Sequence, residues 1–312
     1  MEFHFLGTGA GIPSKERNVS AIALRFLTNR KGEIWLFDCG EATQHQVLHT
    51  NIKLRQVSRI FITHMHGDHI YGLPGVLGTR SFQGGEDQLT IYGPKGIREF
   101  VEVTLQTSGT YLRYPLDIIE VEDGFAYKMN GYTVQIAELD HVLPSFGYRI
   151  TEPNQPGKLN VERLKEIGVL PGPVYQRLKA GEIVELEDGR SLNGKDFTGP
   201  EQPGRVITIC GDTRPTSSIY TLAANADLLI HEATFQEGLE EKAKEFYHST
   251  TVQAATIAKR ANVKRLIITH ISARYKDKEH ELLESAQRIF PDAELASDFS
   301  IHPVPKRKEA NR

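Results

Sequence analysis

The sequence predicts an α/β fold in which helices cover layered β-sheets. In both halves of the 312-residue chain, short runs rich in β-branched and aromatic residues alternate with helical patterns. Several of these runs are followed directly by histidine or aspartate, as is usual where strand ends carry functional groups. Both observations are explained by layered sheets that share one functional edge.

In the first half, β-branched and aromatic residues predict strands at 2–6, 20–28, 33–38, 57–62, 89–92, 117–121 and 132–138. Helices are expected at 41–49, 69–77 and 95–107, and the turn signal Gly93-Pro94 precedes the last of these. The second half has a regular alternation of strands at 205–210, 227–231, 264–269 and 293–296 with helices at 217–224, 236–246, 250–261 and 278–290.

Residues 151–204 differ from both halves. The segment is rich in glycine, has few large apolar residues, and carries Pro153, Pro156, Pro171, Pro173, Pro200 and Pro203. Short helical patterns occur near 160–167 and 173–179. We expect a compact insertion, because long ordered insertions are commonly functional. A surface connection without a role is the alternative.

The composition is that of a globular chain without a strong bias. An apolar share of 39% supports a sizeable core, in one large domain or two smaller ones. The net charge of −3 does not indicate nucleic-acid binding, although a local basic patch would be sufficient for such binding. We find no signal peptide and no membrane-length apolar run, and the only cysteines are Cys39 and Cys210. We therefore expect a cytoplasmic protein without a disulfide framework.

The run Thr63-His64-Met65-His66-Gly67-Asp68-His69 directly follows an apolar strand. It places four potential metal ligands within six positions, and imidazole and carboxylate suit Zn²⁺ or a similar ion. One loop would rarely supply so many ligands to a single closed tetrahedral site, so the run predicts two metals. Two metals about 3.5–4 Å apart are a device for hydrolysing phosphoesters or acyl bonds.

Three later residues occupy the same position relative to a strand. His141, Asp212 and His270 each follow a predicted strand closely, as His64 does. A lone histidine after a strand is usually structural. Four strands that each deliver a ligand to one edge favour a metal site instead.

At these residues the sequence resembles the metallo-β-lactamase superfamily, whose signature His-x-His-x-Asp-His stands here at positions 64–69. The resemblance implies an αβ/βα four-layer sandwich with metals at one edge. It also implies that one metal is held by His64, His66 and His141, the second by Asp68, His69 and His270, and that Asp212 bridges them. The implied cofactor is Zn²⁺, two per chain, although Mn²⁺ accepts the same ligands.

Further motifs are similar to those of the short-form tRNase Z family. They are Pro13-x-Lys15-x-Arg17-Asn18, Gly172-Pro173 in the insertion, His231-Glu232-Ala233-Thr234 and the downstream His248. The resemblance runs from Gly7 to about Ser300, with no departure at a ligand or catalytic position. It implies an endoribonuclease that removes the 3′ trailer of precursor tRNA and leaves a 3′-hydroxyl.

The resemblance also implies catalytic roles. Asp68 would bind metal and accept the proton of the attacking water. His248 is the candidate proton donor to the leaving 3′ oxygen, with Glu232 raising its basicity and fixing its tautomer. Asp38 is expected to orient a metal-ligand histidine. The competing interpretations are a helix-cap histidine at 248 and a helix N-cap at Asp38.

Substrate contacts are expected at Lys15, Arg17 and Asn18 for the acceptor end, at Gly172 and Pro173 in the insertion, and at Arg274 near the scissile phosphate. A structural ion pair is the competing role for Arg274. By resemblance, residues 151–204 form a flexible arm, or exosite, that clamps the tRNA elbow. The same resemblance implies a homodimer in which the arm of one subunit serves the other's site. The basic tail 306–308 has no assigned role.

Two other functions fit parts of the sequence. One is another dinuclear metal hydrolase of the same fold, such as a phosphodiesterase or an arylsulfatase, although a small-molecule hydrolase would not need the 151–204 insertion. The other is a tRNA-binding protein without catalysis, against which the complete ligand set argues.

Overall fold

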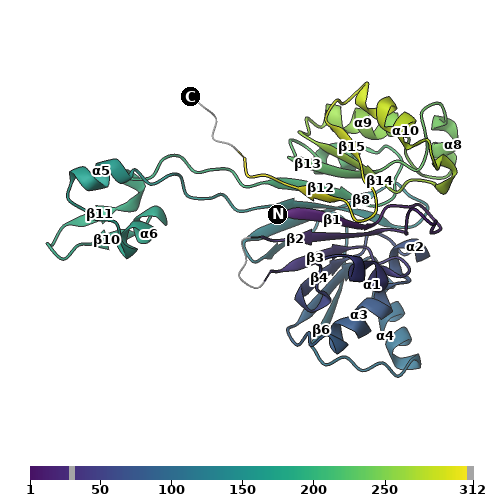
Figure 1. Cartoon of the computed structure of the whole chain (residues 1–312), viewed down its shortest axis with the longest axis horizontal. Coiled ribbons are helices and arrows are strands. Elements are labelled where there is room, and N and C mark those ends of the chain that lie inside the picture. Colours follow the sequence, from purple (N-terminus) through teal and green to yellow (C-terminus); the bar gives the residue numbers. More distant parts are fainter. Residues whose placement is uncertain (28–31, 308–312) are drawn as a thin grey trace. The chain divides into compact units, whose positions relative to one another are not determined.

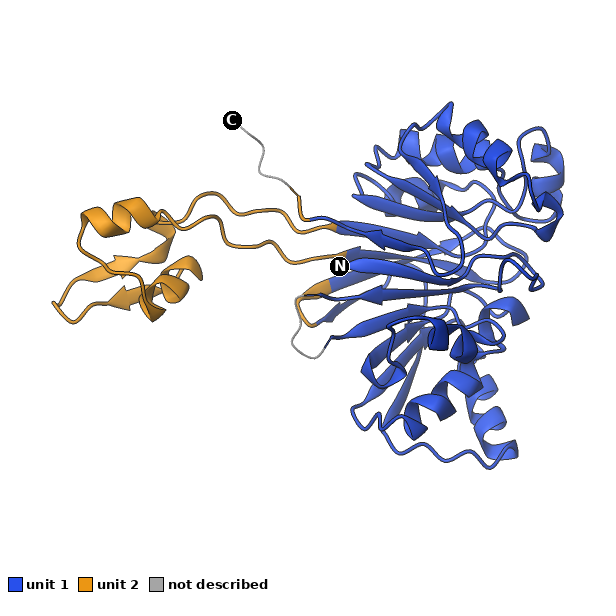
Figure 2. Cartoon of the chain, viewed as in Figure 1, with its two compact units in different colours: residues 1–129, 133–150, 206–305 blue, residues 130–132, 151–205, 306–312 orange. Residues whose placement is uncertain are grey.

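The computed structural model describes residues 1–27 and 32–307, which form two compact units. The larger unit comprises residues 1–129, 133–150 and 206–305, coloured blue in Figure 2. The smaller unit comprises residues 130–132, 151–205 and the C-terminal segment from Lys306. Position 28 of the strand expected at 20–28, and Lys308 of the basic tail, lie outside the described residues.

Two seven-stranded sheets form the larger unit (Figure 1). The first has the order β16 (Ile301–Pro303), β1 (Glu2–Gly7), β2 (Ala21–Arg25), β3 (Ile34–Phe37), β4 (Val57–Phe61), β5 (Leu89–Gly93), β6 (Leu116–Glu120). The second has the order β15 (Ala293–Leu295), β14 (Leu266–Thr269), β13 (Leu228–Glu232), β12 (Val206–Cys210), β9 (Ser145–Thr151), β8 (Tyr132–Leu139), β7 (Ala126–Met129).

Parallel pairing brings the carboxyl ends of neighbouring strands to one edge of each sheet. In the first sheet β3, β4, β5 and β6 are successively parallel, with Phe37 opposite Phe61 in the β3–β4 register. In the second sheet β12, β13, β14 and β15 are successively parallel. Residues that follow these strands therefore emerge together, which is the arrangement α/β proteins use for functional groups.

Aromatic side chains join the two sheets. Phe61 of β4 stacks on Phe37 of β3, with ring centroids 5.0 Å apart. Phe61 also meets the ring of Tyr148, on β9 of the second sheet, at 5.2 Å. The Tyr148 hydroxyl donates a hydrogen bond of 2.6 Å to the carbonyl of Ile62. This buried layer fixes the sheets face to face, because close-packed rings leave little freedom to slide.

Helices pack on the outer faces, as Figure 1 shows for α3 and α4 on the first sheet and α9 and α10 on the second. Those near the first sheet are α1 (Thr43–Gln46), α2 (Gly67–Ile70), α3 (Leu73–Phe82), α4 (Ile97–Thr107) and the 3₁₀ turns η1 (Val47–His49) and η2 (Leu54–Gln56). The second half of the chain adds α7 (Ser217–Leu222), α8 (Glu240–Glu245), α9 (Thr251–Arg260), η4 (Ala273–Tyr275) and α10 (Glu279–Gln287). The expected four-layer αβ/βα sandwich is confirmed. In the described part of the chain, no helix has the length and apolar character needed to cross a membrane.

Several elements differ from the sequence prediction. Strands β7, β9 and β16 were not expected, and β16 has only three residues, too few to show an alternating pattern. It is recognisable only through its pairing with β1, where Pro303 lies opposite Glu2. The helix expected at 69–77 is divided into α2 and α3 at Tyr71-Gly72, and the one expected at 41–49 continues from α1 into η1.

The smaller unit has a core of its own. It contains α5 (Val161–Glu166), α6 (Pro173–Lys179), the antiparallel pair β10 (Ile183–Glu185) and β11 (Ser191–Asn193), and η3 (Gly194–Asp196). These elements enclose Leu164, Val169, Leu178, Val184 and Phe197. The two helices lie where the sequence pattern placed them. The segment is thus a folded element rather than an irregular connection.

The two ends of the insertion are paired with each other. The Arg205 guanidinium binds both carboxylate oxygens of Glu152, each at 2.7 Å, and both residues are buried. Further along, Gln155 and Gln202 exchange two backbone N–H···O bonds of 2.8 Å. This closely spaced pair is the kind that a two-residue turn can close in an antiparallel hairpin.

A close backbone contact beside the strand ends depends on Gly72. Its N–H donates to the Cys39 carbonyl at 2.9 Å, and the Cys39 N–H donates to the His69 carbonyl at 2.7 Å. A Cβ atom at Gly72 would lie 1.9 Å from the Gly40 carbonyl oxygen. Because that oxygen belongs to the backbone, a side chain at Gly72 would force the two segments apart.

We expect Gly72→Ala to lower the free energy of unfolding by about 1–3 kcal/mol, the usual range for overpacking. Gly78→Ala, in the middle of α3, is the matched control, since its Cβ would meet nothing closer than Thr110 Cγ2 at 3.9 Å. Alanine is the better helix former, so this control should be neutral or stabilising by up to about 1 kcal/mol. Denaturant unfolding of both variants tests this, and equal stability would contradict the close contact.

Candidate metal centre

The seven predicted ligands converge at the carboxyl ends of the strands. They are His64 and His66 after β4, Asp68 and His69 in α2, His141 after β8, Asp212 after β12 and His270 after β14. Their ligand atoms form two groups, each with atoms within 4.8 Å of one another: His64, His66, His141 and Asp212, then Asp68, His69 and His270. Asp212 and His270 also form such a group with His248.

In the first group, three imidazole nitrogens face one another. His66 Nδ1 lies 3.1 Å from His64 Nε2 and 3.2 Å from His141 Nε2. His141 Nδ1–H donates to the Tyr247 carbonyl at 2.9 Å, which leaves the lone pair of Nε2 for the group. Asp212 Oδ2 lies 3.6 Å from His64 Nε2.

In the second group, Asp68 Oδ2 lies 3.3 Å from His270 Nε2 and 3.5 Å from His69 Nε2. Asp212 Oδ2 lies 3.3 Å and 3.5 Å from the same two nitrogens, so Asp212 faces both groups. Asp68 Oδ2 also accepts the backbone N–H of Gly11 at 2.9 Å, which ties the 8–18 loop to the site.

The protonation states of the acids suit divalent metal ions. Burial would raise the pKa of Asp68, but hydrogen bonds from His270 and His69 outweigh it and hold that pKa below its usual range. For Asp212, too, histidine neighbours outweigh burial and lower the pKa. Burial lowers the pKa of His64, which keeps the ring neutral. Ionised carboxylates and neutral imidazoles are the forms that bind metal.

His69 is the exception among these ligands. Burial would lower its pKa, but the carboxylates of Asp212 and Asp38 outweigh burial and raise it well above the ordinary value. A divalent metal would replace the second proton on this ring, because ligands deprotonate as they bind. With this exchange, the donor set fits divalent metal ions.

Asp38 orients two of the ligand histidines. Its carboxylate accepts His69 Nδ1–H at 2.7 Å and the Thr63 hydroxyl at 2.9 Å. The Thr63 hydroxyl oxygen lies 2.9 Å from His64 Nδ1 and accepts its proton. The N-cap position of α1 is Ala42, so Asp38 is not a helix cap.

Glu232 holds His248 in a similar way. The carboxylate is 1% exposed and accepts His248 Nδ1–H at 2.9 Å. Burial would lower the pKa of His248, but the charge and hydrogen bond of Glu232 raise it to about 9. His248 is not the cap of α9, since Thr250 caps that helix with Gln253. The His248 ring lies 5.5 Å from the ring of His270, at the edge of the ligand cluster.

The predicted RNA-binding residues of the N-terminal loop differ in exposure. Lys15 is exposed, whereas Arg17 is only 8% exposed and donates from Nη1 to the Thr8 hydroxyl and the Ala296 carbonyl, both at 2.7 Å. Asn18 Nδ2 donates to the Glu41 carbonyl at 2.7 Å. These contacts favour a role for Arg17 and Asn18 in holding the loop.

The remaining predicted contacts are exposed. Arg274 donates to the Ser272 hydroxyl at 3.0 Å, and its guanidinium lies 5.3 Å from the centroid of Phe235. Within the described residues no carboxylate pairs with Arg274, so the structural ion pair is not observed. Gly172 and Pro173 begin α6 in the smaller unit, where both are exposed.

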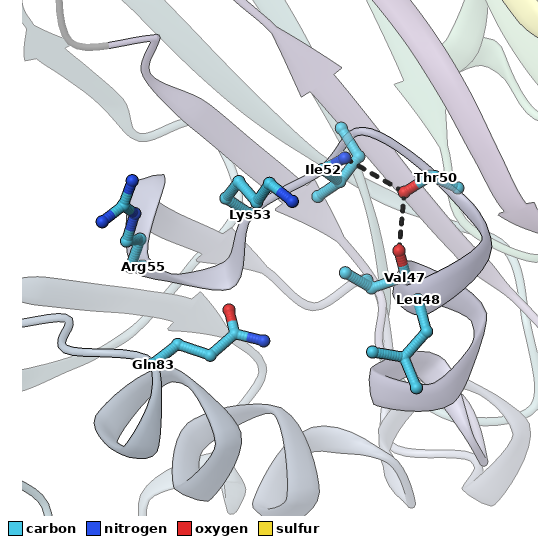
Figure 3. A pocket seen from close by; sticks show the side chains of 7 residues that line it. All are labelled: Val47, Leu48, Thr50, Ile52, Lys53, Arg55 and Gln83. Carbon is cyan, nitrogen blue, oxygen red and sulfur yellow. Dashed lines mark hydrogen bonds between the residues drawn. The ribbon is translucent and has the colours of Figure 1, made fainter.

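A further pocket lies outside the metal cluster (Figure 3). It has a volume of about 390 Å³ and is lined by Val47, Leu48, Thr50, Ile52, Lys53, Arg55 and Gln83. None of these is a predicted ligand. The Thr50 hydroxyl donates to the Val47 carbonyl at 2.9 Å and accepts the Ile52 N–H at 3.1 Å, which closes a local turn. The pocket adds nothing to the chemistry of the metal cluster.

Known proteins are similar to this chain in sequence and in structure. Ribonuclease Z of Bacillus cereus (strain G9842) is 56% identical over 308 residues, covering 98% of this chain and all of that protein. Human tRNase Z, short form, has a TM-score of 0.70 and 32% identity, covering 98% of this chain and 100% of the human chain. The metallo-beta-lactamase fold protein YhfI of Bacillus subtilis shares the fold, with a TM-score of 0.67 and 19% identity over 96% and 98% of the two chains. A family model described as Anti-Pycsar protein Apyc1 matches residues 1–155.

We expect Asp38→Asn to weaken metal binding about 10- to 100-fold, the usual loss when a carboxylate behind a ligand histidine is changed. Asparagine tolerates the positive φ of 57° at this position, so the backbone should be kept. Competition with a chelator measures the affinity. Asp140→Asn is the control. Asp140 directly precedes His141, but its carboxylate accepts a 2.7 Å hydrogen bond from Arg214 and not from a predicted ligand histidine. Equal affinity in the two variants would contradict the orienting role of Asp38.

Proposed function

The chain belongs to the ribonuclease Z family, and from this premise we propose that it is a metal-dependent endoribonuclease that removes the 3′ trailer of precursor tRNA. The supporting observation is the convergence of all seven ligands in a chain that matches ribonuclease Z along nearly its full length. Hydrolysis leaves a 3′-hydroxyl on the tRNA and a phosphate on the trailer.

The cofactor we propose is a pair of Zn²⁺ ions in each chain, and Mn²⁺ could use the same ligands. His64, His66 and His141 would hold one ion, Asp68, His69 and His270 the other, and Asp212 would contact both. The two groups of ligand atoms, with Asp212 facing each, support this division. Bound ions of this kind lower the pKa of the attacking water towards neutrality and offset negative charge on the phosphate.

Protein groups handle the two protons of the reaction. The water oxygen forms a bond to phosphorus, and the bond from phosphorus to the ribose 3′ oxygen breaks. The electron pair of the broken bond stays on the 3′ oxygen. Asp68 takes the proton of the water; its low pKa makes it a weak base, so the transfer depends on an acidified water. His248 gives the 3′ oxygen a proton from Nε2, since Nδ1–H is held by Glu232.

RNA binding is assigned to three regions. Lys15 contacts the acceptor end, and Arg17 and Asn18 hold its loop in place. Arg274 contacts phosphate near the scissile bond. The insertion 151–204, including Gly172 and Pro173, acts as the exosite for the tRNA elbow, with exposed cations such as Lys165 and Lys179 for the RNA backbone.

Two further properties are proposed, the first from the resemblance and the second from the composition of the chain. The first is a homodimer in which each arm serves the site of the other subunit. The second is a cytoplasmic location, which fits two buried cysteines, Cys39 and Cys210, that form no disulfide.

We expect His248→Ala to slow cleavage of a 3′-extended tRNA by roughly 10²- to 10⁴-fold, because the 3′ oxygen would leave without a proton. Metal content should be unchanged, since all seven proposed ligands are intact. Single-turnover kinetics and metal analysis provide the two readings. His280→Ala, an exposed histidine of α10, is the control and should behave as the parent does. Loss of metal from His248→Ala would make His248 a ligand instead.

The exosite role is tested by removing the insertion where its ends pair. Replacing residues 156–201 with Asn-Gly joins Gln155 to Gln202 through a two-residue turn, which their paired backbone groups favour. The Glu152–Arg205 ion pair stays in place below the new turn.

This shortened variant should lose cleavage of precursor tRNA, because the contacts to the tRNA elbow are gone. It should still hydrolyse bis(p-nitrophenyl) phosphate at the parental rate, because the metal ligands lie outside the insertion. Full cleavage of precursor tRNA would refute the exosite. Loss of both activities would mean that the insertion supports the metal site itself.

A further inference from the structure

We propose that Thr234 is a positioning residue whose single hydroxyl fixes the metal ligand His270 and the proton donor His248 together. Thr234 ends the His231-Glu232-Ala233-Thr234 motif and follows strand β13. The inference rests on the proposed function, because it assigns His248 the proton that the 3′ oxygen receives.

The Thr234 hydroxyl lies among three functional side chains. Its oxygen is 2.9 Å from His270 Nδ1, 3.0 Å from Glu232 Oε2 and 3.3 Å from His248 Nδ1. The residue is only 7% exposed, so water competes little for these contacts. Its backbone N–H donates to the same Glu232 oxygen at 2.9 Å, which holds the threonine against the carboxylate.

The direction of each hydrogen bond is determined by its partners. In the proposed metal-bound state, His270 Nε2, which lies 3.3 Å from both Asp68 and Asp212, would use its lone pair for the metal. The ring proton is then on Nδ1 and donates to the Thr234 oxygen. The one hydroxyl proton of Thr234 then goes to an acceptor. Glu232 Oε2 at 3.0 Å is charged and closer than the His270 carbonyl at 3.4 Å, so it receives that proton.

Glu232 thus serves two histidines through its two oxygens. Oε1 accepts His248 Nδ1–H directly, and Oε2 accepts the hydroxyl of Thr234, which in turn accepts from His270. The remaining donors to Glu232 are backbone N–H groups, those of Thr213 and Ser249 on Oε1 at 3.1 Å and that of Thr234 on Oε2. Among the described side chains, the Thr234 hydroxyl is therefore the group that joins His248 in donating to Glu232, and its oxygen also contacts both rings.

The same pattern occurs at the edge of the first sheet. There Asp38 accepts from His69 directly and from His64 through the Thr63 hydroxyl. Both histidines of that set are proposed metal ligands. In the Glu232 set only His270 is one, and the directly bound histidine is the proton donor His248. Thr234 is therefore the link between metal binding and proton donation, whereas Thr63 serves metal binding alone.

The backbone of His270 gives the side-chain contact further importance. His270 has a φ of +58°, a left-handed conformation that an ordinary residue adopts at a cost and only when its surroundings impose it. The Ala233 N–H donates to the Thr269 carbonyl at 3.0 Å, which holds the chain just before His270. The bond to Thr234 then sets the rotation of the imidazole.

The test compares two leaving groups at saturating metal. One substrate is a 3′-extended tRNA with the natural 3′ oxygen at the scissile bond, and the other carries sulfur there. A thiolate leaves without a proton, so the sulfur substrate does not need a proton donor. His248→Ala should be slow on the oxygen substrate and close to the parental rate on the sulfur substrate.

Thr234→Val keeps the size of the side chain and removes the hydroxyl. We expect about 10- to 100-fold weaker metal binding and, at saturating metal, about 10- to 100-fold slower cleavage of the oxygen substrate. The sulfur substrate should be slowed by less than about 3-fold, because the donor step is absent. Thr234→Ser restores the hydroxyl and should recover both properties.

Two matched variants separate this role from general destabilisation. Thr63→Val should weaken metal binding but slow the two substrates equally. Thr208→Val removes another buried hydroxyl, which donates to the Leu222 carbonyl at 3.0 Å away from the ligands. It should change neither the metal affinity nor the ratio of the two rates.

Equal slowing of both substrates by Thr234→Val, or no recovery with serine, would overturn the inference. A His248→Ala variant that stays slow on the sulfur substrate would instead refute the proton-donor role of His248, and the link with it. The two failures are distinguishable because each appears in a different variant.

Discussion

Two buried carboxylates, Asp38 and Glu232, govern the geometry of the metal centre. A charge removed from water must be matched by hydrogen-bond donors, and each of these acids is matched by a histidine and a threonine hydroxyl. Each directly bound histidine donates Nδ1–H to the carboxylate. Its Nε2 atom is therefore left with a lone pair for a metal or with a proton for the substrate. The need to neutralise buried charge therefore determines which nitrogen of each ring points towards the metals or the substrate.

The fold provides the positions that this network needs. Asp38 directly follows β3 in the first sheet, and Glu232 ends β13 in the second. Parallel pairing brings the ends of these strands and their neighbours to one edge, and the Phe61–Tyr148 contact locks the two sheets face to face. Two similar acid–threonine–histidine sets thus meet around Asp212. They differ in the histidine that the acid binds directly, which is the proposed metal ligand His69 in one set and the proposed proton donor His248 in the other.

The sequence was informative where a function is encoded locally. The ligands of the 64–69 run are contiguous, and His141, Asp212 and His270 follow strands with clear apolar patterns, so their convergence was predictable from strand ends. The hydroxyls of Thr63 and Thr234 are adjacent to recognised motifs, but their hydrogen bonds depend on side-chain directions that no spacing rule gives. Burial of Arg17 was equally hidden, because its partners Thr8 and Ala296 are brought together only by the tertiary fold.

The paired ends of the insertion have a consequence for how this family can vary. Closing a flexible loop has an entropy cost that grows only with the logarithm of its length, by about 0.6 kcal/mol for each doubling. Since Glu152 meets Arg205 and Gln155 meets Gln202, the chain re-enters the second sheet beside the point where it left. The stability of the sandwich is thereby insulated from the size of the insertion. Natural selection can lengthen, shorten or reshape that segment without redesigning the sandwich that carries the metal-ligand cluster.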